Sequence, residues 1–266
     1  MPHNTNIRIS RKLDKQGVHK GEGETDFVAR LSAEKLLQCV VQSSLGKNKN
    51  DKNALLLYER DVSLADGIQR WFSSIDQVPF KAIREKPGQL ESMLAAEQYT
   101  LLLSNLAFDW VDAGEFIALM DYLLLAEGQF WFSCYGPQTA ANTRGVLSEL
   151  DQYAHFNDYY DIEDIGDALL GAGFKEVVLE SSVVNIEYHS VGALLADATR
   201  VFGVNSNTDK RTSMTPKRVL REFKQRVQEM IDSEGVFSEQ VEVLIAHGKK
   251  ANVPRLGGVI PVRQPG

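Results

Sequence analysis

Short apolar runs alternate along the chain with longer segments whose apolar residues recur at helical spacing. Apolar runs of four to eight residues predict buried strands. Apolar residues that recur every three or four positions predict helices with one buried face. The predicted strands include the apolar run that begins at Ala54 within NALLLYE, YTLLLSN over 99–105, QFWFSCYG over 129–136 and VEVLIAHG over 241–248. The predicted helices include DFVARLSAEKLLQCVVQSSL over 26–45, the segment 112–126 and most of 191–232.

The order of these segments predicts an α/β fold. Strands that alternate with helices form a mostly parallel sheet covered on both faces. VPFKAIRE over 78–85 is interpreted as the second strand, and KEVVLESSVVNIEYHS over 175–190 as one or two strands. The late strands predict an antiparallel edge. We expect a flexible arm over 1–25, one domain over 26–248 and a flexible tail over 249–266.

Composition narrows the class of protein. The 266 residues are 43% hydrophobic and carry a net charge of −7, with an isoelectric point near 5.3. An acidic chain lacks the basic face that general nucleic-acid binding requires. The sequence predicts no membrane span, no secretory leader and no metal site. With only two cysteines, Cys39 and Cys134, the expected compartment is the reducing cytoplasm.

A connected series of segments in the second half resembles a known family. The segments are SNLAFDWVD (104–112), LLLAEGQFWFSCYGPQT (123–139), YYDIEDIGDALLGAGFKEVVLE (159–180), NIEYHSVGALLADATRVFGVNS (185–206) and SMTPKRVLREF (213–223). In this order and spacing they resemble class I S-adenosylmethionine-dependent methyltransferases. The similarity is to the subgroup that methylates the free carboxyl of a malonyl thioester, bound to an acyl carrier protein, in biotin biosynthesis.

The resemblance implies a Rossmann-like sheet with a helical acceptor-side insertion, here at about 140–160 and 190–235. It implies S-adenosylmethionine as cofactor, bound across the carboxyl ends of the first strands. It also implies a glycine-rich turn after the first strand, because a Cβ there would collide with the ligand. An acidic residue at the end of the second strand is expected to bind the ribose.

This chain departs from that pattern in its cofactor half. The residues after the first predicted strand are Tyr58, Glu59, Arg60, Asp61 and Val62, without a glycine. Glu85 is the candidate for the ribose acid, and a solvated surface charge is the alternative. The span from Leu57 to Ser104 is also short for the family. The sequence therefore predicts a shortened cofactor half that binds S-adenosylmethionine poorly or not at all.

The acceptor half keeps more of the family pattern. A malonyl carboxylate is already the nucleophile at neutral pH, so the protein need only align it. Arg144 is the candidate carboxylate clamp because arginine binds carboxylates at two points. Tyr135 and Gly136 match the family's aromatic-Gly-Pro loop. Asn105 and Trp110 flank the exit of the fourth strand, where Asn105 could contact the cofactor and Trp110 the acceptor.

Each of these residues also has a structural interpretation. Arg144 would then be a surface residue at a helix start, Tyr135 and Gly136 a turn shaped for packing, and Trp110 a core residue. The leading functional hypothesis is a noncatalytic pseudoenzyme that binds an acyl carrier protein or regulates a partner methyltransferase. The alternative is an active carboxyl O-methyltransferase with an unconventional cofactor loop. A basic cluster is the candidate carrier surface, with a solvated helix face as the alternative: Lys210, Arg211, Lys217, Arg218, Arg221, Lys224 and Arg226.

Overall fold

The computed structural model describes residues 7–11, 27–42, 53–58, 63–79, 94, 96–201 and 215–252. The strands are β1 Ile7–Arg11, β2 Asn53–Tyr58, β3 Ser74–Pro79, β4 Tyr99–Asn105, β5 Leu124–Tyr135, β6 Phe174–Tyr188 and β7 Phe237–Lys250. The helices are α1 Phe27–Gln42, α2 Ser63–Ile68, η2 Gln69–Trp71, η4 Phe108–Trp110, α5 Ala113–Leu123, α6 Ala141–Ser148, α7 Ile162–Gly171, α8 Val191–Val201 and α9 Lys217–Glu234.

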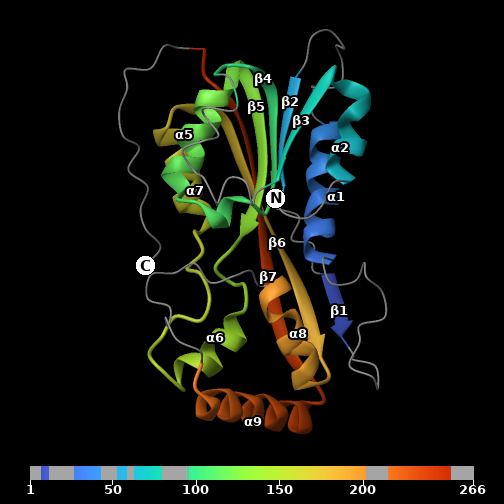
Figure 1. Cartoon of the computed structure of the whole chain (residues 1–266), viewed down its shortest axis with the longest axis vertical. Coiled ribbons are helices and arrows are strands. Elements are labelled where there is room, and N and C mark those ends of the chain that lie inside the picture. The colour runs from blue at the N-terminus through green and yellow to red at the C-terminus, as the bar shows by residue number, and fades with distance from the viewer. Residues whose placement is uncertain are drawn as a thin grey trace.

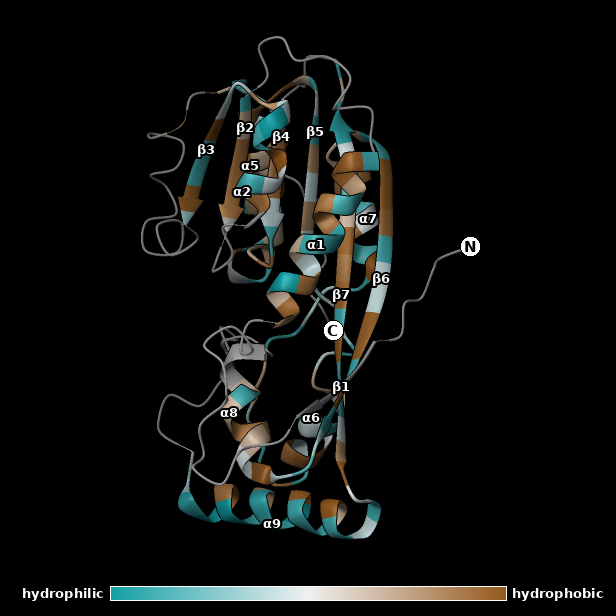
Figure 2. Ribbon diagram, turned by 90° about the vertical axis from the view of Figure 1, so that its right-hand side faces the viewer, coloured by the Kyte–Doolittle hydropathy of each residue, from teal (hydrophilic) through white to brown (hydrophobic). Residues whose placement is uncertain are grey.

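The described strands form one sheet in the order β1-β6-β7-β5-β4-β2-β3, and Figure 2 shows strands β3 to β6 of this sheet side by side. Neighbouring strands are parallel except where β7 pairs with β5 and β6. The predicted α/β fold with a mostly parallel sheet is confirmed. The antiparallel strand β7 is the third strand from one edge of the sheet, with β6 and then β1 outside it.

Helices cover both faces of the sheet, with α1 and α2 on one side and α5 and α7 on the other (Figure 1). Alternate residues of the central strands enter two separate cores. In β2, Leu56 packs with the α1 and α2 core, whereas Leu55 and Leu57 pack with the α5 and α7 core. This double burial explains why the central strands are continuous apolar runs in the sequence.

The remaining helices, α6, α8 and α9, gather at one end of the sheet, where α9 lies across the end (Figure 1). The apolar side of α9 faces the protein and its outer side is hydrophilic (Figure 2). Its buried residues, Val219, Phe223, Val227 and Ile231, recur every four positions, as one helix face requires. None of the helices within the described residues is long and apolar enough to cross a membrane.

Three expectations from the sequence need correction. Residues 7–11, expected within a flexible arm, form β1, which pairs in parallel with Val184–Tyr188 of β6. The second strand of the core, β3, begins at Ser74, four residues before the predicted start at 78, and residues 80–85 lie outside the described part of the chain. The final strand extends to Lys250, beyond the predicted domain end at 248. β1 and β3 are the edge strands of the described sheet, and most side chains of β3 are half-buried or exposed, so that its sequence lacks a continuous apolar run.

Candidate functional site

The carboxyl ends of four parallel strands form one row, in which Pro79 of β3 pairs with Tyr58 of β2, Tyr58 with Asn105 of β4, and Asn105 with Ser133 of β5. In open α/β sheets, ligands bind in the crevice beyond such strand ends. Tyr58 is the last residue of β2. The next helix begins at Ser63, so the connection has room for only Glu59, Arg60, Asp61 and Val62. These four residues and Glu85 lie outside the described residues.

Gly67, the first glycine after β2, lies inside α2 and not in this connection. A Cβ placed on Gly67 would come within 2.6 Å of Cδ2 of Leu37 on α1. The missing side chain therefore lets α2 pack closely against α1. Gly67 has a packing role in this fold.

Asn105 closes β4 with its side chain almost completely buried. Its Nδ2 donates a hydrogen bond of 2.9 Å to the carbonyl oxygen of Ala29 in α1, and its Oδ1 accepts one of 3.0 Å from the Ser133 hydroxyl. Both ends of the amide therefore tie α1, β4 and β5 together. The next residue, Leu106, adopts a left-handed φ of 53° and donates to Ser133 Oγ at 3.0 Å, which fixes the turn into η4.

A second group of side chains gathers where β5 ends, and it contains the predicted acceptor residues. The rings of Tyr135 and Tyr159 are 5.8 Å apart and both are buried. The Arg144 guanidinium donates to the carbonyl oxygen of Pro137, and its Cζ lies 6.0 Å from the centre of the Tyr159 ring. The structure therefore brings Tyr135, Gly136 and Arg144 together. We call this group, with Tyr159, the acceptor cluster.

Tyr159 was not among the sequence candidates, although its aromatic pair with Tyr160 precedes the acidic helix start. Burial, followed by the negative charge of Asp109, raises the pKa of the Tyr159 phenol well above its usual value, and nearby Arg144 offsets part of this rise. The phenol therefore stays neutral at physiological pH and does not repel an anion beside Arg144. Asp109 itself accepts a hydrogen bond of 3.0 Å from the Tyr135 amide. Trp110 ends η4 beside Asp109, and its side chain lies outside the described part of the chain.

Two buried glutamates of β7, Glu242 and Glu239, accept hydrogen bonds from residues around the acceptor cluster. The Glu242 carboxylate accepts hydrogen bonds from the Gln138 amide at 3.0 Å and from the Ser181 hydroxyl at 2.6 Å. The Glu242 side chain occupies the space next to Gly136, where a Cβ would lie 2.4 Å from Oε2 of Glu242. Gly136 is thus required because the loop after β5 lies directly against a buried glutamate.

The other carboxylate, Glu239, caps the helix that carries Arg144. The N-cap residue of α6 is Ala140, whose side chain cannot accept a hydrogen bond. Glu239 accepts instead from the amides of Asn142 at 3.2 Å and Thr143 at 2.7 Å. Burial raises the pKa of Glu239, and these amide hydrogen bonds offset part of the rise. A negative charge at a helix N-terminus also interacts favourably with the helix dipole.

Other polar residues near β5 have structural partners. His155 lies 2.8 Å from the Asp151 carboxylate within the same loop. Cys134 is fully buried, and burial raises the pKa of its thiol well above the usual value, so little reactive thiolate forms. Among the described residues, no cluster of histidine, cysteine and carboxylate side chains is arranged to hold a metal ion.

The described part of the predicted basic cluster lies on α9. Lys217, Arg218, Arg221 and Lys224 are exposed there, whereas Lys210 and Arg211 lie outside the described residues. Arg218 pairs with Glu222 one turn away at 2.9 Å, and Arg226 pairs with Glu149 of the segment that follows α6. α9 therefore carries exposed basic side chains, and its Arg226 links it to Glu149, which follows the helix of Arg144.

Comparison with known proteins gives relatives of one kind. No family model matches the chain. The malonyl-[acyl-carrier protein] O-methyltransferase of Gallionella capsiferriformans is 27% identical over 203 residues, which are 74% of this chain and 66% of that protein. The same-named protein of Nitrosospira multiformis is 28% identical over 51% of this chain and 45% of its own length. The matched part of the chain thus spans about half to two thirds of these relatives.

Solved structures agree on the fold. A Bacillus halodurans protein assigned as a methyltransferase matches with a TM-score of 0.50 and 13% identity, over 84% of this chain and all of that one. The YcgJ protein of Bacillus subtilis matches with the same TM-score and coverage at 9% identity. The chain therefore has the Rossmann-like fold of class I methyltransferases, and its curated homologues are malonyl-[acyl-carrier protein] O-methyltransferases.

Proposed function

We propose that this protein binds the free carboxylate of a malonyl-type thioester at the acceptor cluster, as a noncatalytic member of the methyltransferase fold with an impaired S-adenosylmethionine site. The observation that carries the proposal is the position of Arg144 beside the buried ring of Tyr159, which packs against the buried ring of Tyr135. A guanidinium offers a planar fork of five donors, and a carboxylate accepts two of them in parallel. Tyr135 and Tyr159 exclude water from one side and thereby strengthen the attraction between the charges.

The residues at the strand ends do not fit S-adenosylmethionine, which would supply the methyl group as an electrophile when bound. The four residues that connect β2 to α2 include no glycine, whereas this ligand requires a bare backbone after the first strand. Gly67 lies within α2 and packs on Leu37. The amide of Asn105 is engaged by α1 and Ser133. These three features support a protein that retains the acceptor half of the site and has lost the cofactor half.

The competing function is an active carboxyl O-methyltransferase with a rearranged cofactor loop. The names of the relatives favour it, because each is called an O-methyltransferase. In either case this chain's own residues do the same work: Arg144 orients the carboxylate, and the aromatic rings exclude water. The two functions differ in whether a methyl ester forms.

Replacing Arg144 by methionine should remove most of the affinity for a malonyl thioester. Hydrogen bonds to a charged group contribute about 2 kcal/mol, so we expect about thirtyfold weaker binding of malonyl-N-acetylcysteamine. Arg144→Lys keeps the positive charge without the two-point geometry, so its affinity should lie between those of the wild type and Arg144→Met. Isothermal titration calorimetry measures the affinities, with Arg70→Met, an exposed arginine near β3, as the matched control. Equal affinities for the wild type and Arg144→Met would contradict the proposal.

The same titration tests the proposed partner, an acyl carrier protein that docks on the exposed basic residues of α9. Carrier helices of acidic character would complement these charges. A malonyl-loaded carrier should therefore bind more tightly than the small thioester at low salt, and the difference should shrink as salt is added. A carrier that binds no more tightly than malonyl-N-acetylcysteamine would remove α9 as a docking surface.

A further inference from the structure

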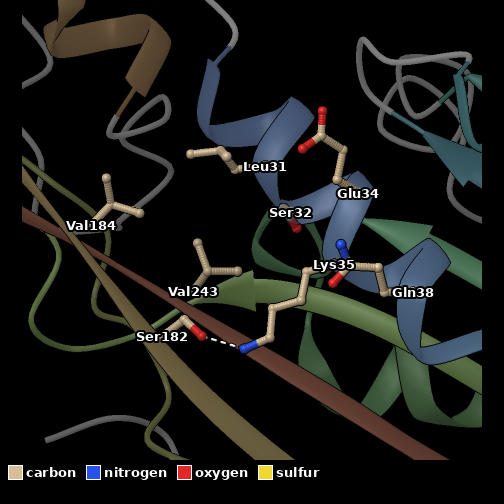
Figure 3. Close-up of a pocket in the computed structure, with 8 residues that line it drawn as sticks. All are labelled: Leu31, Ser32, Glu34, Lys35, Gln38, Ser182, Val184 and Val243. Atoms are coloured by element: carbon tan, nitrogen blue, oxygen red, sulfur yellow. Dashed lines mark hydrogen bonds between the residues drawn. The ribbon is translucent and has the colours of Figure 1, made fainter. Parts of the chain in front are cut away.

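A cavity of about 200 Å³ lies between α1 and the β6–β7 part of the sheet, apart from the acceptor cluster. One side of α1 forms its roof and the two strands form its floor, as Figure 3 shows. A cavity of about 150 Å³ is large enough to hold benzene. This cavity therefore has room for a small organic group. The lining residues are Leu31, Ser32, Glu34, Lys35, Gln38, Ser182, Val184 and Val243.

The walls combine apolar side chains with hydrogen-bonding groups. Val184 and Val243 are buried in the floor. The Lys35 side chain crosses the cavity, and its amine donates to the Ser182 hydroxyl (Figure 3). Ser32 is 3% exposed, and its hydroxyl has no hydrogen-bond partner among the described residues. A buried hydroxyl without a partner is unfavourable, and a ligand that hydrogen-bonds to it would remove the cost.

The charges around the cavity favour a neutral ligand. Lys35 contributes one positive charge, and the Glu180 carboxylate lies 3.5 Å from its amine. Glu34, an exposed lining residue, adds a second carboxylate near the cavity. An anion would meet two carboxylates for one ammonium group, whereas a cation would meet the ammonium group inside the cavity. An amide avoids both problems, since its carbonyl accepts from Lys35 or Ser32 and its N–H donates to a serine hydroxyl.

The cavity lies on the same sheet face as the aromatic wall of the acceptor cluster. Tyr135 of β5 pairs with Val243 of β7, and Val243 pairs with Ser182 of β6. Directly paired residues of neighbouring strands point to the same face. Two strand spacings separate Tyr135 from Ser182, which places their backbones about 10 Å apart. One extended ligand could therefore have its carboxylate at Arg144 and its next polar group at the cavity.

We propose that this cavity binds the amide-bearing arm that follows the sulfur of a carrier-bound thioester. The inference rests on the proposed function, because it extends the acceptor cluster into a two-part site for carboxylate and arm. The neutral amide would contact Lys35, Ser32 and Ser182. The methylene groups would pack on Leu31, Val184 and Val243.

The test uses the full-length, ¹⁵N-labelled protein and two separate probes. N-acetylcysteamine carries the amide arm without the carboxylate, and malonate carries the carboxylate without the arm. We expect millimolar N-acetylcysteamine to shift the amide resonances of Ser32, Lys35 and Ser182, and malonate to shift those around Arg144. Lys35→Met removes a charged donor and should weaken N-acetylcysteamine binding about tenfold. Lys175→Met, which replaces an exposed lysine at the start of β6, is the matched control and should bind N-acetylcysteamine as the wild type does.

A second variant covers the case in which Lys35→Met disturbs α1. Leu31 is half-buried, so Leu31→Trp fills the cavity with little effect on the core and should abolish the N-acetylcysteamine shifts while those with malonate persist. Absent shifts at the cavity in the wild type would overturn this inference and leave the acceptor proposal intact, provided that malonate still binds. If N-acetylcysteamine binds in the cavity and malonate binds nowhere, the acceptor proposal is contradicted, and with it the two-part site. Butanoate binding in the cavity as tightly as the amide would overturn the preference for a neutral group.

Discussion

Gly136→Ala should destabilise the protein by about 2–3 kcal/mol, because the new methyl group has no space. A Cβ at this position would lie 2.4 Å from Oε2 and 2.6 Å from Cγ of Glu242. Glu242 cannot move aside freely, since its carboxylate holds the Gln138 amide and the Ser181 hydroxyl. Displacing it would leave a buried charge with fewer partners. Urea unfolding followed by circular dichroism measures the change.

Gly145→Ala is the matched control for this substitution. Gly145 lies within α6, and a Cβ there would meet no atom within 4 Å. Alanine in a helix is more favourable than glycine by up to about 1 kcal/mol, so this variant should unfold at the same or a higher urea concentration. Similar losses in both variants would show that the contact with Glu242 does not decide the requirement for glycine.

Glu239→Ala should destabilise the protein by about 2–3 kcal/mol, because two amides at the start of α6 lose their acceptor in a buried environment. Glu239→Ala should also bind the malonyl thioester more weakly than the wild type, since α6 carries Arg144. Glu234→Ala, which replaces an exposed glutamate at the end of α9, should change neither property. Unfolding by urea and the calorimetric titration together test the prediction. Unchanged stability in Glu239→Ala would refute the capping role.

The contribution of Glu239 to the stability of the protein should change with pH in a defined direction. Burial raises the pKa of Glu239 in the folded protein above that of an unfolded glutamate, so the folded state binds this proton more tightly. The resulting stability is fully present below the unfolded pKa and is lost as the pH rises through the folded pKa. Glu239→Gln replaces the carboxyl group by an amide that does not titrate. The stability of the wild type relative to Glu239→Gln should therefore fall as the pH rises through that window, and a constant difference would contradict the raised pKa.

The sequence predicted the central strands well because each is buried on both faces. The run YTLLLSN coincides with β4, and ALLLY lies within β2. The edge strands were harder to predict. β3 has mostly half-buried or exposed side chains, so its segment SIDQVP lacks a continuous apolar run. β1 depends on pairing with β6, whose matching residues lie far away along the chain, and its own five residues give no local signal of that partner.

The acceptor cluster was predicted in part. Tyr135, Gly136 and Arg144 were named because they match the pattern of the resembled family directly after a strong strand, and the structure places Tyr135 and Arg144 around Tyr159. Glu239 and Glu242 were missed because glutamates near the start of a strand look like solvated charges. Their role depends on contacts with residues about a hundred positions earlier in the chain, at Thr143 and Gln138. Only the folded arrangement of β7 against the loop after β5 reveals that both carboxylates are buried.

The two candidate functions differ in whether the protein binds S-adenosylmethionine and transfers its methyl group, and a direct measurement can separate them. The protein would be titrated with S-adenosylhomocysteine and then incubated with S-adenosylmethionine and malonyl-N-acetylcysteamine, with mass spectrometry of the products. We predict that the malonyl thioester binds, that S-adenosylhomocysteine gives no submillimolar binding, and that no methyl ester forms. Formation of the methyl ester above the background without protein would contradict the noncatalytic assignment.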